Sequence, residues 1–467
     1  MTWGKIFRRT LTAFLIVAGL FTAAVGGAKI QMYTATGEDY ANEVESQDIA
    51  KLRARDKAIK KATKQAGVYL KSYSRSVAGE LTDDEITAIT SNAWQLVGEP
   101  QYSRTVKQVS DETTIIVWTA TVEVNVDDSE IQSWIKRDDK EKFNIVTQTR
   151  EAQKASEEND RKIEDLREKY NRATSQAEKD NIRKQMTDAD RDFLANQKFE
   201  EALKLYYAKD YHGAIKLNTE AIELKPDWSW PYNNRGVAYY DLGQNERAIQ
   251  DYNKAIQLNP NYADAYNNRG IAYRHLGQYE RAIQDYNKAI QLNPNYAEAY
   301  NNRGVAYMDG LKQYERAIQD YNKAIQLNPN YTEAYYNRGT AYAKLGQYMI
   351  AIQEFDKAIQ LNPNYAHAYN NRGAVYDELK QYELAISDYN KAIELNQNYA
   401  DAYNNRSIAY SNLKQYEKAI ADKTKVIQLR PNDAKAYYWR GKYYEALGEA
   451  AKAQADFAKA KQLGYNG

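Results

Sequence analysis

The chain has 467 residues, more than one compact core accommodates, so it divides into several folding units. Its 64 basic and 63 acidic residues nearly cancel, which argues against nucleic acid as a partner because the chain as a whole has no positive field to concentrate polyanions. The chain has no Cys and only three His, which excludes disulfides and thiolate metal sites and leaves little for His-based catalysis. We therefore expect no metal and no other cofactor.

The N-terminal segment, residues 1–28, has the order of an export signal. Basic side chains in residues 1–10 precede an apolar run at residues 11–25, and small residues then lead to Ala28. The run is shorter than the roughly 20 residues of a typical membrane-spanning helix. We expect either cleavage after Ala28 or a retained membrane anchor over residues 11–28. Both outcomes predict an exported protein of the bacterial cell envelope, periplasmic or anchored in the membrane by its N-terminus.

Residues 29–127 predict a small α+β domain. A first strand is expected at residues 30–36, and residues 47–73 carry apolar side chains at helical spacing. Residues 102–109 and 113–126 read as two strands around a short polar turn, which predicts a β-hairpin.

The helices of this domain have two further features. Arg55 is the one interruption in the apolar stripe of the first helix. Thr82 and Glu85 form a capping box at the start of a second helix, which we expect to include Trp94 and Leu96 and to end at the next proline. The domain shows no carboxylate pair, nucleophile elbow or phosphate-binding loop, so we assign it no chemistry.

Two segments of this domain carry a resemblance to known proteins: SQDIAKLRARDKAIKKATKQAGVYLKSYS and LTDDEITAI. The domain is similar to the N-terminal domain of exported tetratricopeptide proteins of some anaerobic bacteria. More distantly, it resembles small envelope lipoprotein domains and flagellar-assembly T-protein domains. The resemblance implies an envelope location and no particular activity.

Residues 128–192 are rich in charged side chains of both signs and contain no Pro or Gly, which predicts an extended helix. Ile163, Leu166 and Tyr170 form an apolar stripe that is too short for a coiled coil of several heptads. This pattern favours a semi-rigid spacer over a dimer zipper. In either case, the segment would hold the rest of the chain away from the N-terminal domain or the membrane.

A proline recurs at intervals of 34 or 35 residues through the C-terminal part of the chain, with Gln397 at one missing place. This period, and the unit AEAYNNRGVAYMDGLKQYERAIQDYNKAIQLNPN, identify residues 193–467 as an array similar to the tetratricopeptide repeats. The resemblance implies a mainly α protein, a right-handed α-solenoid of helix hairpins that stack and share a core. We expect eight repeats: 195–228, 229–262, 263–296, 297–331, 332–365, 366–399, 400–433 and 434–467.

Each repeat places the same residue types at packing positions. A Gly in the first helix is expected to face an Ala in the second, as for Gly304 and Ala317, because a larger side chain would push the helices apart. Packing positions such as Tyr252 and Tyr286 explain most of the 42 Tyr residues. An Arg before the Gly position and an acid sixteen or seventeen residues later predict a ladder of ion pairs. The pairs are Arg235–Asp251, Arg269–Asp285, Arg303–Asp320, Arg338–Glu354, Arg372–Asp388, Arg406–Asp422 and Arg440–Asp456.

In the family that the repeats resemble, the first helices line a concave groove. Ligand-facing side chains come from the second, fifth, sixth, ninth, twelfth and thirteenth residues of a repeat, which we call the groove face. Asn dominates its fifth and sixth positions: Asn233, Asn234, Asn267, Asn268, Asn301, Asn302, Asn337, Asn370, Asn371, Asn404 and Asn405. A carboxamide both donates and accepts, so these side chains are predicted to bind the backbone of an extended peptide. Asn is also unfavourable inside helices, so its repeated presence there suggests that these side chains bind a ligand. The alternative is that repeat duplication simply copied a polar face that water hydrates.

Two other groove positions vary between repeats and are expected to set specificity, with Arg274 and His367 among the candidate residues. The second position carries Trp230, Asp264, Glu298, Glu333, His367 and Asp401, and the twelfth carries Tyr240, Arg274, Met308, Ala343, Asp377 and Ser411. Their charge is mixed and slightly acidic. No run of Lys and Arg is present, which argues against recognition of C-terminal carboxylates as in chaperone-binding relatives.

These features predict a non-catalytic protein-protein interaction scaffold of the bacterial envelope that binds an extended peptide or protein segment. Two alternatives remain open. A self-assembling structural protein is one, because the last repeat has no recognisable polar capping helix and could stack on a second copy. An accessory subunit of an envelope enzyme or assembly machine is the other.

Overall fold

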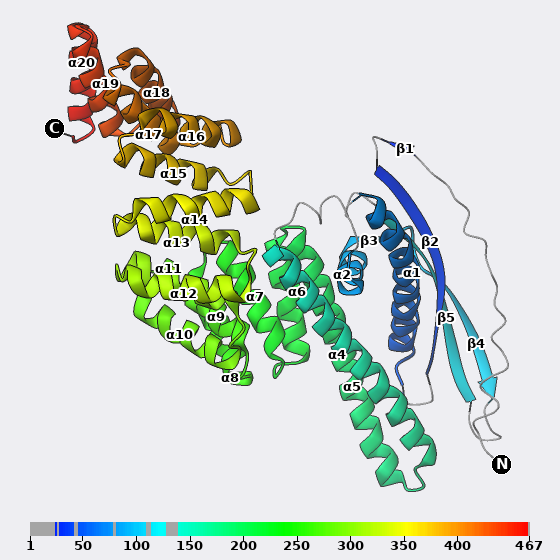
Figure 1. Cartoon of the computed structure of the whole chain (residues 1–467). Helices are drawn as coiled ribbons and strands as arrows, with labels where there is room; N and C mark the ends of the chain where they lie inside the picture. Colours follow the sequence, from blue (N-terminus) through cyan, green and yellow to red (C-terminus); the bar gives the residue numbers. More distant parts are fainter. Residues whose placement is uncertain are drawn as a thin grey trace. The chain divides into compact units, whose positions relative to one another are not determined.

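A computed structural model of the chain describes residues 24–25, 28–41, 45–77, 81–108, 114–127 and 139–465 (Figure 1). The chain forms two compact units, Met1–Leu242 and Gly243–Gly467, and each is treated separately below. Nearly all of the expected signal or anchor, residues 1–28, lies outside the described residues. Within the described ranges, no helix combines the length and the apolar composition that crossing a membrane requires.

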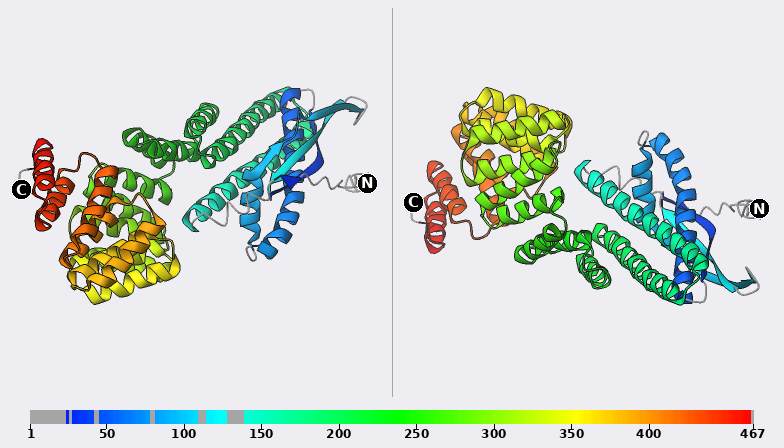
Figure 2. Two further views of the ribbon diagram at one scale, coloured as in Figure 1. Left: turned by 90° about the horizontal axis from the view of Figure 1, so that it is seen from above. Right: turned by 90° about the horizontal axis from the view of Figure 1, so that it is seen from below.

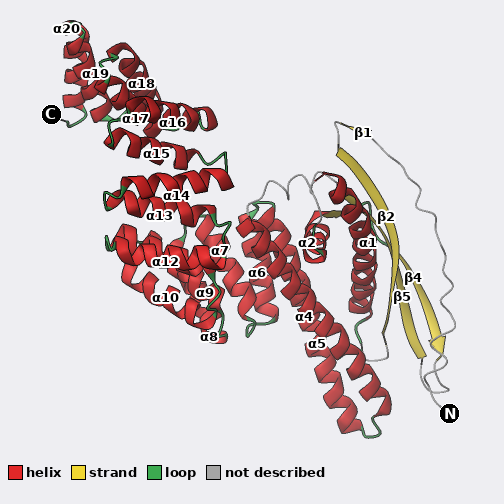
Figure 3. Cartoon of the chain, viewed as in Figure 1, coloured by secondary structure: helices red, strands yellow, loops and turns green. Residues whose placement is uncertain are grey.

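The first unit contains a twisted antiparallel sheet beside a long helix (Figure 3). The strands are β1 (Ala24–Val25), β2 (Ala28–Ala41), β3 (Trp94–Leu96), β4 (Gln101–Gln108) and β5 (Thr114–Asp127). Their order is β1-β2-β5-β3, and β4 also pairs with β5. Helix α1 (Gln47–Val77) packs its small apolar side chains against β2 and β5. It approaches β2 so closely that a Cβ atom at Gly37 would overlap the α1 backbone, so this position requires Gly.

The predicted first strand, first helix and hairpin of this domain are confirmed, but the second helix is shorter than expected. Thr82 and Glu85 form the predicted capping box at the start of α2 (Asp83–Ala93). Trp94 and Leu96 lie in β3 and pair with residues 124–126 of β5. Since β4 covers only residues 114–121 of β5, the remaining edge is open for β3, and sheet pairing ends the helix before the proline does.

The charged connector is helical, as predicted, but it is not an extended spacer. It forms α4 (Asp139–Arg172) and the start of α5 (Gln176–Tyr207), and Ser175 caps the second of these helices. The two helices pack on each other, so the stripe of Ile163, Leu166 and Tyr170 meets α5 within the same chain. Helix α4 also packs on α2 and lies against β2 through the charge cluster described below. The apolar stripe is therefore satisfied inside one molecule, and the connector is part of the first unit.

Helix pairs follow α5 along the chain, and those of the second unit stack in order (Figure 2). The first unit ends with α6 (Tyr211–Leu224) and α7 (Ser229–Asp241). The second unit contains α8 (Asn245–Leu258), α9 (Ala263–His275), α10 (Tyr279–Leu292), α11 (Ala297–Val305), η2 (Ala306–Gly310), α12 (Tyr314–Leu327), α13 (Thr332–Lys344), α14 (Tyr348–Leu361), α15 (Ala366–Glu378), α16 (Tyr382–Leu395), α17 (Ala400–Asn412), α18 (Tyr416–Leu429), α19 (Ala434–Ala446) and α20 (Ala450–Gln462). The predicted α-solenoid is confirmed. The extra residue of the 35-residue repeat is taken up by the π-helical turn η2.

The nearest neighbours of the helix Gly residues are aromatic rings, and the expected Ala lies behind them: a Cβ atom on Gly373 would lie 2.8 Å from the Tyr389 ring and 3.2 Å from the Ala385 carbonyl oxygen. A Cβ atom on Gly304 would lie 2.6 Å from Tyr321 Cε1, and one on Gly270 would lie 2.7 Å from Tyr286 Cε1. Both rings are fully buried. The Gly is therefore needed because the ring of the second helix occupies the place of its side chain, which also accounts for much of the Tyr content.

The predicted ladder of arginine and acid pairs is present in the second unit. Arg303 donates from Nε and Nη2 to the two carboxylate oxygens of Asp320 at 2.8 and 2.6 Å. Its Nη1 atom also donates to Asn287 Oδ1 of the preceding repeat at 2.6 Å, a contact that the sequence did not reveal. The same pairing occurs at Arg269, Arg338, Arg372, Arg406 and Arg440. Each guanidinium thus joins the second helices of two consecutive repeats.

Candidate functional site

Side chains of consecutive first helices are hydrogen-bonded to one another on the groove face. The sixth residue of a repeat donates from Nδ2 to the Oδ1 atom of the fifth residue in the preceding repeat, and we call this series the asparagine ladder. Its bonds measure 3.0, 3.0 and 3.1 Å: Asn302 to Asn267, Asn337 to Asn301, and Asn405 to Asn370. In the repeat that has Tyr336 at the fifth position, the Tyr336 hydroxyl accepts from Asn371 Nδ2 at 3.0 Å.

The ladder separates the predicted site residues into two groups. The fifth-position residues Asn267, Asn301 and Asn370 are 2 to 6% exposed, and their Oδ1 atoms accept from the next repeat. Packing between repeats therefore explains these three, because a buried carboxamide needs hydrogen-bond partners. The sixth-position residues Asn302 and Asn337 are only half-buried, and in the described part of the chain their side chains make no other hydrogen bond. Each retains a donor and an acceptor for a ligand.

The remaining predicted Asn residues are placed as follows. In the first unit, Asn233 and Asn234 are buried, and Asn233 Nδ2 donates to Asn234 Oδ1 at 3.2 Å. In the second unit, Asn268 is half-buried at a sixth position. Asn404 Nδ2 donates to Asn405 Oδ1 at 3.3 Å. The predicted array is thus a bonded network with a half-buried sixth-position row.

Arg274 and His367, the two other predicted site residues, differ in exposure. Arg274 is half-buried, and its Nε atom is buried with no partner among the described residues. His367 is exposed, and its Nδ1 atom lies 2.7 Å from the hydroxyl of Tyr399. His367 therefore belongs to an aromatic group at one edge of the groove face.

Family models match the helix pairs from residue 237 to residue 455. A TPR repeat model matches residues 237–274, 270–309 and 311–346. Tetratricopeptide repeat models match residues 332–365, 366–399, 388–421 and 424–455. The chain belongs to the tetratricopeptide repeat family. Such proteins are generally non-catalytic interaction scaffolds, and the repeats make this chain a scaffold for a protein or peptide partner.

Several solved structures are similar to parts of this tetratricopeptide repeat protein. MamA is 31% identical over 36% of this chain and 96% of its own, with a TM-score of 0.32. YrrB, described as a TPR protein with an unusual peptide-binding site, is 28% identical over 40% of this chain and 95% of its own, with a TM-score of 0.33. A tetratricopeptide repeat protein from Parabacteroides merdae is 27% identical over 51% of this chain and 94% of its own, with a TM-score of 0.42.

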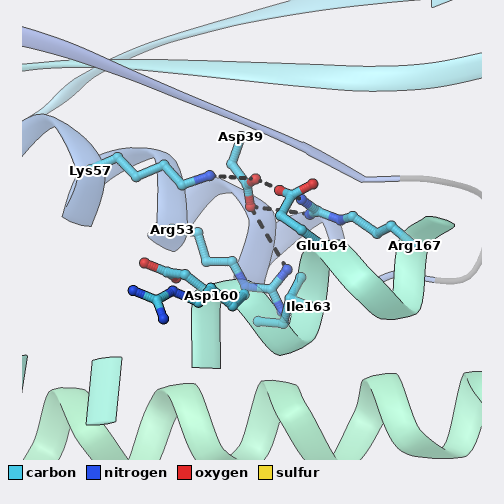
Figure 4. A pocket seen from close by; sticks show the side chains of 8 residues that line it. Asp39, Arg53, Lys57, Asp160, Ile163, Glu164 and Arg167 are labelled. Atoms are coloured by element: carbon cyan, nitrogen blue, oxygen red, sulfur yellow. Dashed lines mark hydrogen bonds and ion pairs between the residues drawn. The ribbon is translucent and has the colours of Figure 1, made fainter. Parts of the chain in front are cut away.

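A second group of functional candidates lies in the first unit of this tetratricopeptide repeat protein, where β2, α1 and α4 meet (Figure 4). Arg167 donates from Nε to Glu45 Oε1 at 2.9 Å and from Nη1 to Asp39 Oδ1 at 3.0 Å. Arg53 donates to Glu45 Oε1 at 3.1 Å. These four residues, which we call the buried charge cluster, are each less than 10% exposed. Sequence analysis missed them, because Arg167 comes from α4, 122 residues after Glu45.

Three members of the cluster, Asp39, Arg53 and Arg167, line a cavity of about 410 Å³ together with more exposed residues such as Asp160 and Glu164. The charged groups of the cluster neutralise one another. Lys57 Nζ donates to Asp39 at 3.0 Å, and Arg53 also pairs with Asp190 of α5. No group of metal-ligating side chains was found among the described residues. The contacts of Arg167 with Asp39 and Glu45 fix α4 against β2 and the start of α1.

The pKa of Asp39 reflects this arrangement. Burial opposes its ionisation, but the charges of Arg167, Lys57 and Arg53 outweigh burial and hold the pKa of the Asp39 carboxyl below its usual value. The ionised carboxylate therefore stabilises the fold, and protonation at acidic pH weakens the attachment of α4.

Proposed function

We propose that the chain is a scaffold of the bacterial cell envelope that holds an extended segment of a partner protein on the first helices of its repeats. The observation that carries this proposal is that Asn302 and Asn337 have hydrogen-bonding groups left for a ligand. Both side chains are oriented by the asparagine ladder, and each retains an N–H group and an oxygen atom. A peptide backbone presents the complementary C=O and N–H groups in every non-proline residue, so sequence-independent binding follows.

The ladder also favours binding energetically, because it fixes the carboxamides before the partner arrives. A side chain that is already ordered loses less conformational entropy on binding. Each peptide hydrogen bond adds only about 0.5 to 1.5 kcal/mol net, so useful affinity requires several repeats acting together. A segment that spans several repeats satisfies this requirement.

Photo-crosslinking in the native host tests this proposal with the full-length chain. A photoreactive amino acid replaces Ala343, a twelfth-position groove residue, or Gln326, an exposed residue of the second helix α12. We expect a covalent partner adduct from position 343 and none from position 326. Adding Asn302→Ala and Asn337→Ala should reduce the adduct at least fivefold, because the backbone contacts of two repeats are lost.

The matched control is Asn267→Ala combined with Asn301→Ala. These changes break the same ladder bonds but leave the sixth-position carboxamides in place. Adduct yield should then fall clearly less than with Asn302→Ala and Asn337→Ala, because the contacting carboxamides remain and only their prior ordering is lost, even though stability falls by about 1 to 3 kcal/mol per unsatisfied partner. Equal loss of the adduct in both pairs of variants would show that the ladder is structural only, and the peptide-groove proposal would fail.

The envelope location is supported by the basic, apolar and small-residue order of residues 1–28. A fusion of alkaline phosphatase after Gly467 measures it, because this enzyme is active only where its disulfides can form. We expect activity from the full-length fusion and a loss of more than tenfold when residues 2–28 are deleted. Activity that does not depend on these residues would contradict the proposed export.

A further inference from the structure

Aromatic rings gather at the edge of the groove face in the fifth and sixth repeats. The ring centroids of Tyr336 and Tyr365 are 5.1 Å apart, and those of Tyr365 and His367 are 6.0 Å apart. His367 and Tyr399 follow at 4.9 Å. We call these four residues the aromatic edge. The Tyr336 hydroxyl accepts from Asn371 of the asparagine ladder, so the edge continues directly from the Asn side chains.

The surroundings of the aromatic edge are acidic. Glu333 is exposed, forms no hydrogen bond or ion pair within the described ranges, and lies close enough to Tyr365 for its charge to help raise the pKa of that phenol. Asp401 acts on Tyr399 in the same way, and it also pairs with Arg430 at 2.7 Å. Burial is the larger cause of both shifts.

The acidic character extends along the second positions of the neighbouring repeats. In the third to fifth repeats these positions are Asp264, Glu298 and Glu333, and the seventh repeat has Asp401. Burial raises the pKa of Asp264, and a hydrogen bond from Tyr296 opposes this shift; His367 contacts Tyr399 in the same way, so a second-position side chain meets the last tyrosine of its own repeat in both cases. None of these second positions carries Lys or Arg. Acids at four of these five second positions favour a partner whose positive charges recur along an extended segment.

We infer that the groove of the third to seventh repeats selects a basic peptide segment, and that the aromatic edge binds one of its Arg or Lys side chains. This inference rests on the proposed peptide-binding function and names the class of partner. A guanidinium or ammonium group is attracted to the faces of Tyr rings and to the Glu333 carboxylate at the same place. An acidic side chain would be repelled by Glu333, and a neutral one would lack the charge interaction.

Fluorescence anisotropy of labelled decapeptides with the purified protein tests the inference. The probes alternate Ser with Arg, with Gln or with Glu, and all have the same length and label. We expect the Arg peptide to bind at least tenfold more tightly than the Gln peptide at 50 mM NaCl, and the Glu peptide not to bind. The preference should shrink at 300 mM NaCl because salt screens exposed charges.

Two variants locate the binding site. Glu333→Gln should lower the affinity for the Arg peptide about fivefold to tenfold and leave the affinity for the Gln peptide unchanged. The matched control is Glu315→Gln, which removes an equally exposed acid from the second helix α12 and should have no effect. Tyr365→Leu should lower the affinity for the Arg peptide. The melting temperature of the protein should change little, because Tyr365 is only half-buried.

The outcomes separate this inference from the proposed function. Equal binding of the Arg and Gln peptides, lost with Asn302→Ala and Asn337→Ala, would leave the peptide groove standing and overturn the charge selection. Equal weakening by Glu315→Gln and Glu333→Gln would also overturn it, as would the absence of any binding of the Arg peptide at 1 mM. The crosslinking experiment, which uses natural partners, decides the proposed function independently.

Discussion

Replacement of Arg167 by Ala should destabilise the first unit by about 3 to 5 kcal/mol, the usual cost of removing one partner from a buried ion pair. The Arg167 side chain is 1% exposed, and its guanidinium is shared by Asp39 and Glu45, which are also buried. Both carboxylates would remain buried with one cation fewer. Urea unfolding followed by tryptophan fluorescence measures the loss, because six of the seven Trp residues precede residue 243.

The control for this prediction is Arg161→Ala on the same helix. The Arg161 side chain is 79% exposed, and its one ion pair within the described ranges is with Glu157 at 3.5 Å, so its loss should cost no more than about 0.5 kcal/mol. Equal destabilisation by the two variants would contradict the role of the buried charge cluster.

The pH dependence supplies a second measurement. The folded pKa of Asp39 lies below its usual value, so its ionised form contributes stability above about pH 4 that is lost as the pH falls through the folded pKa. The difference in stability between the unaltered chain and Arg167→Ala should therefore be largest near pH 7 and smaller at pH 3. A difference that stays constant over this range would contradict the assignment to Asp39.

The repeats could be predicted from sequence because each one carries the same residue types at the same positions. The 34-residue period set the helix pairs, and the recurring Arg and acid gave the ion pairs of the second unit. The orientation of the Gly residues could not be read in this way. Gly304 is followed by both Ala317 and Tyr321 at helix-facing positions, and only the packed structure shows that the ring is the nearer neighbour.

The roles of the Asn residues were also beyond the sequence, since the fifth and sixth positions look alike there. The difference arises because the sixth residue reaches back to the preceding repeat, which buries the fifth. One substitution in the repeats was nevertheless consistent with this role. Tyr336 replaces Asn at a fifth position, and a hydroxyl can accept the same hydrogen bond.

The connector was misjudged because its break contains neither Pro nor Gly. The missed signal is Ser175, which precedes Glu178 in the spacing of a helix N-cap and accepts a hydrogen bond from its backbone N–H. A helix start in the middle of a charged run implies that the chain turns there. The thin apolar stripe around Leu166 then has a partner stripe around Met186 in the same molecule.

The seventh repeat departs from the packing of its neighbours at two positions that face each other in the other repeats. Ser407 takes the place of the helix Gly, and Lys423 takes the place of the aromatic residue that covers it. Both are buried, and burial lowers the pKa of the Lys423 ammonium to about 8. Without a ring above it, the helix has room for a Ser side chain, so the two changes compensate each other.

Lys423 also ends the asparagine ladder. In the preceding repeats, the fifth-position oxygen accepts from the sixth residue of the next repeat, but the eighth repeat has Trp439 at that position. Trp439 offers no carboxamide, and Lys423 Nζ donates to Asn404 Oδ1 at 2.5 Å instead. The buried cation therefore supplies the donor that the last repeat lacks, which explains why a costly buried amine is present.

Restoring the consensus packing should consequently require three changes made together. Lys423→Tyr alone should cost about 1 to 3 kcal/mol or more, because the ring would overlap Ser407 and Asn404 would lose its donor. Adding Ser407→Gly should recover the part of the stability loss that the overlap with Ser407 causes. Adding Trp439→Asn to both changes should supply the missing donor and raise stability further. Urea unfolding of the full chain, followed by circular dichroism and by hydrogen exchange of α17 and α18, measures the series. Additive effects of Ser407→Gly and Lys423→Tyr would show that the two positions are independent, because compensating neighbours must show a coupling energy.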